Sequence, residues 1–88
     1  MRNLVSGAQF QRDVKLARKR GKNMAKLREL ILLLSEGASL PPRYKDHPLR
    51  GNWQDYRDCH IEADWSLIYK IVDDDVYLVR TGSHSDLF

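Results

Sequence analysis

Residues 65–82, WSLIYKIVDDDVYLVRTG, carry the clearest strand pattern in this 88-residue chain. In the first eight of these residues, apolar side chains occupy alternate positions, as they do on one face of a strand. That face would carry Trp65, Leu67, Tyr69 and Ile71. Three aspartates, residues 73–75, follow as a polar turn, and residues 76–81 return to a strand pattern. The spacing predicts a β-hairpin near the end of the chain.

Two helices are expected before this hairpin, because apolar residues recur there at helical spacing. The first is expected to begin at Ser6, where the run Ser6-Gly7-Ala8-Gln9 fits a capping box. Gly21 is expected to end it in a left-handed conformation. The second is expected to begin after Asn23 as its cap and to end at Gly37.

The remaining strand candidates are residues 2–5 and 56–61, with a proline-rich loop before the second. Residues 83–88 are expected to form a short flexible tail after the last strand. The resulting order, β-α-α-β-β-β, predicts one α+β domain over residues 1–88. In this fold a helical hairpin packs on one face of an antiparallel sheet.

Positive charge is concentrated in the first half of the chain. The net charge is +3, but residues 1–50 contain 12 Lys/Arg and 4 Asp/Glu, a balance of +8, whereas residues 51–88 contain 3 and 8, a balance of −5. Such a basic segment suits a polyanion such as RNA, although a solvated helix face has the same composition. The cations expected to project from the helical hairpin include Lys15, Arg18, Lys19, Lys22 and Lys26.

No apolar run approaches the roughly 20 residues of a membrane span, and no signal-peptide pattern is present, so no membrane association is expected. Cys59 is the single cysteine, which excludes an internal disulfide and fits a reducing cytosol. We therefore expect a cytoplasmic protein.

The three histidines, His47, His60 and His84, all lie in the second half, and each has an acidic residue within four positions. Imidazole titrates near neutral pH, so these side chains are suited to moving protons. With Cys59 they lack the short paired spacing of structural zinc ligands, and neither a metal nor another cofactor is expected. The combination favours a small enzyme that acts on nucleic acid.

Four separated segments carry a resemblance to a known family: YKDHPL at residues 44–49, YRDCHIEADW at 56–65, LIYK at 67–70 and RTGSHSDLF at 80–88. In this order they closely resemble the YafQ-type toxins, which belong to the RelE/ParE superfamily of bacterial toxin–antitoxin systems. The resemblance covers essentially the whole chain.

The resemblance implies a ribosome-dependent endoribonuclease that cuts translated mRNA in the ribosomal A site. It also implies a cognate antitoxin as a partner, and we expect the complex of the two proteins to bind its own operator DNA. The hairpin cations Lys15, Arg18, Lys19, Lys22 and Lys26 would then contact ribosomal RNA. The functional positions that it implies are His47, His60, Asp64, Trp65, His84 and Phe88.

RNA can be cleaved when its 2′-OH attacks the adjacent phosphate. This reaction needs a base, an acid and positive charge at the phosphate, and it requires no metal. We expect His84 to be the acid. His60 and Asp64 are both candidates for the base. His60 could instead bind phosphate, and Asp64 could instead orient a histidine. His47 could bind phosphate or adjust the proton affinity of its neighbours.

Other residues are expected on the substrate side of the site. Arg80 could stabilise phosphorane charge or form an ion pair within the protein. Phe88 and Trp65 could stack on RNA bases, although Trp65 fits the core almost as well. Asp58 precedes His60 by two residues, so both would point to the same face of their strand.

Two other functions remain open from the sequence. A gyrase-inhibiting toxin of the ParE kind would share the fold, but we expect no histidine-based acid–base set in it. A non-catalytic module that binds RNA or DNA through the basic hairpin would leave the histidines without a role.

Overall fold

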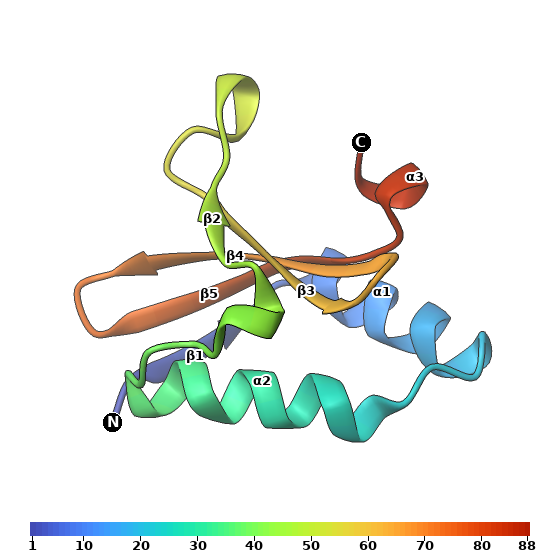
Figure 1. The fold of residues 1–88 in the computed structure, drawn as a ribbon, viewed down its shortest axis with the longest axis horizontal. Coiled ribbons are helices and arrows are strands. Elements are labelled where there is room, and N and C mark those ends of the chain that lie inside the picture. The colour runs from blue at the N-terminus through green and yellow to red at the C-terminus, as the bar shows by residue number, and fades with distance from the viewer.

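The computed structural model describes residues 1–88 and contains a five-stranded sheet with the order β1-β5-β4-β3-β2 (Figure 1). The strands are β1 (Asn3–Ser6), β2 (His47–Pro48), β3 (Arg57–Glu62), β4 (Trp65–Val72) and β5 (Asp75–Gly82). The helices are α1 (Ala8–Lys19), α2 (Met24–Glu36) and α3 (His84–Leu87), with short 3₁₀ turns η1 (Pro42–Tyr44) and η2 (Gly51–Trp53). None of the helices combines the length and hydrophobicity needed to cross a bilayer.

The predicted hairpin is formed by β4 and β5, which pair antiparallel around the aspartate turn. The sheet as a whole is not purely antiparallel, however, because β1 pairs parallel to β5. β3 occupies one edge of β4, so the first strand can add only to the free edge of β5. There the chain runs in the same direction as β5 before it turns into α1. The prediction of an antiparallel sheet was wrong for this one edge strand.

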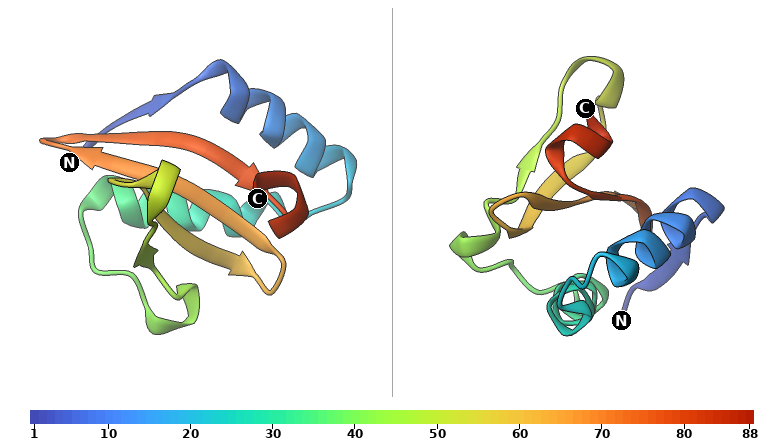
Figure 2. Two further views of the ribbon diagram at one scale, coloured as in Figure 1. Left: turned by 90° about the horizontal axis from the view of Figure 1, so that it is seen from above. Right: turned by 90° about the vertical axis from the view of Figure 1, so that its right-hand side faces the viewer.

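Helices α1 and α2 cover one face of the sheet, as the sequence predicted, whereas α3 and the η2 segment lie on the other face (Figure 2). Side chains from both long helices and from β3, β4 and β5 share one core on the first face. The core cluster consists of Phe10, Ala17, Leu27, Leu30, Leu34, Tyr44, Cys59, Trp65, Leu67, Tyr69, Val76 and Leu78. Ile68 points away from this cluster and is also fully buried, so β4 is covered on both faces.

The helix ends test the cap predictions. Asn23 caps α2, with its side chain accepting the backbone N–H of Ala25 at 3.1 Å. Gly21 and Gly37 have φ angles of 79° and 72°, which confirms their left-handed positions. The capping box at Ser6 is wrong, because Ser6 is the last residue of β1 and Gly7 caps α1 without any side-chain bond.

The end of the chain also differs from the prediction of a flexible tail. Residues 84–87 form α3, and this helix turns back over the sheet. Likewise, the loop after α2 contains β2, a strand of only two residues that pairs with β3. Alternation placed Ile71 on one face of β4 with Trp65, Leu67 and Tyr69, but Ile71 is 37 % exposed, whereas the other three are buried.

Candidate active site

An open cleft lies on the face of the sheet opposite α1 and α2. Its volume is about 310 Å³. The lining residues are His47, Leu49, Asp58, His60, His84 and Phe88. All three histidines of the chain therefore meet in one place, although up to 37 positions separate them in the sequence.

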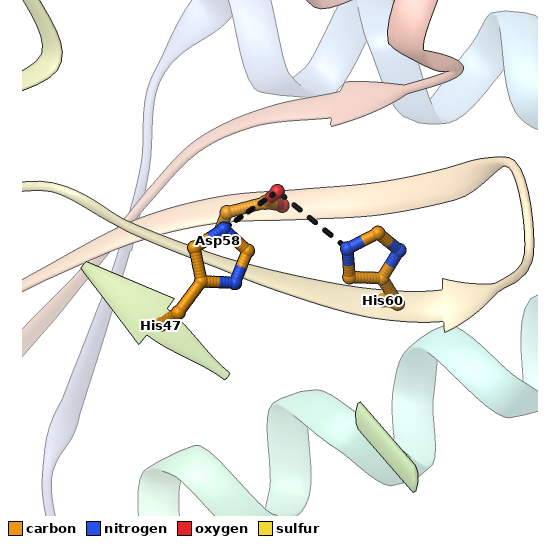
Figure 3. A group of neighbouring side chains, drawn as sticks. All are labelled: His47, Asp58 and His60. Atoms are coloured by element: carbon orange, nitrogen blue, oxygen red, sulfur yellow. Dashed lines mark ion pairs between the residues drawn. The ribbon is translucent and has the colours of Figure 1, made fainter. Parts of the chain in front are cut away.

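The β2–β3 pairing assembles one side of the cleft. His47 and Asp58 are directly opposite each other in the register, and His60 follows on the same face of β3. Both imidazoles point toward the Asp58 carboxylate (Figure 3). Oδ2 of Asp58 lies 3.8 Å from Nε2 of His47 and 3.9 Å from Nε2 of His60. We call these three residues the histidine cluster.

Asp58 lies beneath the two imidazoles rather than on the surface. The residue is 5 % exposed, and its Oδ1 atom is buried without a hydrogen-bond partner. Burial raises the pKa of Asp58 above its ordinary value, and the nearby His60 and His47 offset only part of this effect. The position supports a role for Asp58 in holding the imidazoles, and it leaves little of the carboxylate for direct contact with RNA.

A hydrogen bond to the backbone orients the His47 ring. Its Nδ1 lies 2.7 Å from the carbonyl oxygen of Lys45, and since a carbonyl only accepts, Nδ1 carries the proton and donates it. Nε2 of the neutral ring is then the unprotonated atom, and it faces the Asp58 carboxylate (Figure 3). The neighbouring Asp46 is held by Arg57 at 3.2 and 3.1 Å and by the hydroxyl of Tyr69 at 2.6 Å. This network anchors the loop that presents His47.

Helix α3 forms the other side of the cleft and carries His84 at its start, with Phe88 directly after its end. The Ser83 side chain accepts from the Asp86 N–H at 3.2 Å, and Asp86 accepts from the Ser83 N–H at 2.9 Å, which completes a capping box. Asp64, in the β3–β4 turn, accepts the backbone N–H of His84 at 3.0 Å. The observed contact of Asp64 therefore fits orientation of a histidine better than it fits a base.

Phe88 is 52 % exposed and extends from the end of α3 into the cleft. Its ring centroid lies 5.1 Å from that of His84 and 6.2 Å from that of Trp53 in η2. An exposed aromatic ring beside an imidazole offers a stacking surface for a base.

Two predicted substrate residues have other partners. Trp65 is 1 % exposed and donates its indole N–H to Thr81 at 2.9 Å, so the structure favours its role in the core. The Arg80 guanidinium binds the Asp13 carboxylate of α1 at 2.7 and 3.3 Å, and this ion pair raises the pKa of Arg80. Asp13 also accepts the Thr81 N–H at 3.1 Å, which ties α1 to the end of β5.

The predicted RNA-binding cations lie on α1, on α2 and in the turn between them, away from the cleft. Lys15, Arg18 and Lys19 form no ion pair within the protein. Lys26 binds Glu62 at 3.0 Å, and the ammonium of Lys22 lies 5.9 Å from the centre of the Trp65 ring. Among these five predicted cations, the three without such a partner therefore lie on α1.

The histidine cluster has the composition of a metal site. One ligand atom from each residue lies within 4.8 Å of the other two. Two imidazoles and a carboxylate suit Zn²⁺ or Cu²⁺, and the unpartnered Oδ1 of Asp58 leaves a further acceptor. The argument from sequence spacing did not foresee this group, because strand pairing assembles it. Cys59 takes no part, since it is buried in the core on the other face.

Some site residues were not identified from the sequence. Leu49 lines the cleft, and the Trp53 ring lies edge-on to the Phe88 ring, with 6.2 Å between their centroids. The pattern Ser83-x-x-Asp86 is a capping-box signal and could have located α3. Arg20, whose guanidinium binds Asp86 at 2.6 Å, gives no such signal.

Comparisons with known proteins identify the family of the chain. The sequence profile of the family described as "Bacterial toxin of type II toxin-antitoxin system, YafQ" matches residues 2–88. The chain is 50 % identical over 88 residues to the mRNA interferase toxin YafQ of Escherichia coli K12, covering 99 % of this chain and 96 % of that protein.

Two solved structures extend the comparison. One is the DinJ–YafQ toxin–antitoxin complex of E. coli, with a TM-score of 0.91 and 50 % identity over 99 % of this chain and 97 % of that chain. The other is a metal-bound toxin from Helicobacter pylori, with a TM-score of 0.93 and 38 % identity over the whole of both chains. By sequence and by fold, this chain belongs to the YafQ family of bacterial type II toxin–antitoxin toxins.

Proposed function

We propose that this protein is an mRNA interferase that cleaves translated mRNA in the ribosomal A site. The observation that carries the proposal is the convergence of His47, His60, His84 and Phe88 on one cleft. The name of the E. coli relative, mRNA interferase toxin, supports the same activity. The solved DinJ–YafQ complex supports a cognate antitoxin as the partner that controls it.

The proposed reaction divides proton transfer between the two sides of the cleft. An imidazole of the histidine cluster takes the proton of the 2′-OH, and the oxygen attacks the adjacent phosphorus. The bond from phosphorus to the 5′ oxygen breaks, and His84 gives a proton to that leaving oxygen. The products are a 2′,3′-cyclic phosphate and a 5′-OH end.

The remaining residues support this division. Asp58 stabilises positive charge on the imidazoles, Asp64 holds the start of α3, and Phe88 stacks on a base next to the cut. A divalent ion held by His47, Asp58 and His60 would occupy the imidazole nitrogens that the proposed proton transfer uses. The reaction as proposed needs only the protein's own acid and base.

The ribosome is the proposed binding partner because α1 carries three cations without an ion pair and lies away from the cleft. α1 contacts ribosomal RNA through Lys15, Arg18 and Lys19, while the opposite face of the sheet meets the mRNA. Replacing these three cations by alanine is expected to weaken ribosome association and to flatten its dependence on salt.

The test is single-turnover cleavage of an mRNA on programmed ribosomes, with the free mRNA as a parallel substrate. We expect cleavage only on the ribosome, 2′,3′-cyclic phosphate ends, and resistance to a chelator that removes transition metals but leaves Mg²⁺. His84→Ala should lower the rate by about 10²–10⁴-fold. Intact mRNA together with damaged DNA in cells would instead indicate a gyrase-directed toxin.

A further inference from the structure

We propose that Arg20 is a positioning residue for the cleavage reaction, which holds α3 so that His84 and Phe88 face the cleft. The inference rests on the proposed function for its catalytic consequence. Arg20 follows the last residue of α1, and it is not among the residues that line the cleft.

The contact that carries the proposal joins two elements far apart in the sequence. Nη1 of Arg20 lies 2.6 Å from Oδ2 of Asp86, and Nη2 lies 3.4 Å from Oδ1. The guanidinium thus meets both carboxylate oxygens, which defines its orientation as well as its distance. In keeping with this, Arg20 and the Ser83 bonds hold the pKa of Asp86 well below its usual range.

Helix α3 needs such an anchor because it has only four residues. A helix of this length is unstable alone, since nucleation costs more than one turn of hydrogen bonds returns. Asp86 is the residue that closes its capping box, so Arg20 binds the same carboxylate that organises the helix. Loss of Arg20 would leave this carboxylate free to rotate away from the Ser83 N–H.

The Asp86 side chain packs tightly against the end of β5, which restricts its position. A Cβ atom on Gly82 would lie 3.0 Å from both Cβ and Oδ2 of Asp86, so the helix turns back tightly onto the end of β5. Asp64 holds the same helix from another direction through the His84 N–H at 3.0 Å. Arg20 and Asp64 therefore bind α3 at two points, the Asp86 carboxylate and the His84 N–H.

If the Arg20–Asp86 ion pair served only the stability of the fold, its loss would not lower the cleavage rate specifically. The Arg20 side chain is 44 % exposed, and exposed pairs contribute little to the free energy of global unfolding. The proposal therefore predicts a loss of cleavage rate without a matching loss of stability. A displacement of about 1 Å at a reacting group can lower the rate on the order of 10²-fold.

The experiment compares Arg20→Ala, Arg20→Lys and Arg28→Ala in the full chain. Arg28 is an exposed arginine on α2 that forms no ion pair, so its loss controls for the change in net charge. For Arg20→Ala we expect a single-turnover rate at saturating ribosomes lowered by about 10–100-fold. The ribosome concentration for half-maximal rate and the melting temperature should change little. Arg20→Lys should recover much of the rate, and Arg28→Ala should match the wild type.

A second measurement reports on α3 without any cleavage. In the NMR spectrum of Arg20→Ala, we expect loss of the contact between the rings of Phe88 and Trp53, which are 6.2 Å apart in the structure. An unchanged rate, a change in half-maximal concentration alone, or an unchanged Phe88–Trp53 contact would overturn the proposal. A wild-type protein that does not cleave on ribosomes would overturn the proposed function, while the NMR comparison would still decide whether Arg20 holds α3.

Discussion

Replacing Asp58 by asparagine should make the protein less active but no less stable. Asp58 is 5 % exposed, and burial raises its pKa, so the ionised carboxylate is disfavoured in the folded protein. A carboxyl group with a raised pKa lowers stability as the pH rises from the unfolded value through the folded value. At neutral pH, asparagine removes that cost, because its amide carries no charge. We therefore expect the free energy of unfolding to stay constant or to rise by up to about 1 kcal/mol.

The expected loss of activity follows from the distances. Oδ2 of Asp58 lies 3.8 and 3.9 Å from the two imidazole nitrogens. At an effective dielectric constant of about 20, a carboxylate stabilises an imidazolium at this distance by roughly 4 kcal/mol. The imidazole side chains are 48 % and 32 % exposed, so solvent reduces this to roughly 1–2 kcal/mol. The cleavage rate should fall about tenfold, because about 1.4 kcal/mol corresponds to one factor of ten.

The assay combines thermal unfolding at pH 7 with single-turnover cleavage on programmed ribosomes. Asp74→Asn, the same chemical change in the exposed hairpin turn, is the matched control and should alter neither quantity. If Asp58→Asn cleaves at the wild-type rate, the carboxylate does not support the imidazoles in the reaction. If the variant unfolds much more easily, the negative charge of Asp58 is a structural requirement and the reasoning from burial is wrong.

Three further predictions concern the two sides of the cleft. Gly82→Ala should displace Asp86 and lower the cleavage rate while the core stays folded, because the added Cβ would lie 3.0 Å from the Asp86 side chain; wild-type activity would show that α3 tolerates the shift. Added Cu²⁺ or Zn²⁺ should inhibit cleavage reversibly, since imidazoles of the histidine cluster that bind a metal cannot exchange protons; stimulation of cleavage by the metal would contradict the proposed acid–base roles. Because the pKa of Asp86 is lowered, its charge supports α3 at neutral pH, and this support should fade only below the ordinary aspartate value of about 3.9. NMR shifts of Ser83 and Asp86 during an acid titration would show it, and a transition near neutral pH would contradict it.

The sequence predicted the elements that local rules determine. The β4–β5 hairpin follows from alternating apolar residues and a polar turn, and Asn23 and Gly37 mark the ends of α2 through their own side-chain and backbone preferences. The parallel pairing of β1 with β5 could not be predicted in this way, because it joins residues about 70 positions apart. Ser6 shows that a local motif can mispredict a helix start, because this residue is the last of β1 although the capping-box pattern assigned it to α1.

The site was predicted less completely for a related reason. The resemblance identified the three histidines, Asp64 and Phe88, but not how they are held. β2 has two residues and α3 has four, so neither is long enough to show periodicity in the sequence. The support of His47 by Asp58, and of α3 by Arg20, arises only from pairing between distant segments.

Because the elements around the cleft are short, we expect α3 to open locally at a lower free energy than global unfolding requires. α1, α2 and the buried face of the sheet share one large core, whereas α3 is held by Leu87, by the capping box and by bonds to Arg20 and Asp64. Segments with few buried apolar contacts open at a lower free energy than the whole protein. We therefore expect the Asp86 and Phe88 amides, which bond within the α3 turn, to exchange hydrogen much faster than the Leu67 amide in β4. Equal protection of the three amides would show that α3 unfolds only together with the core.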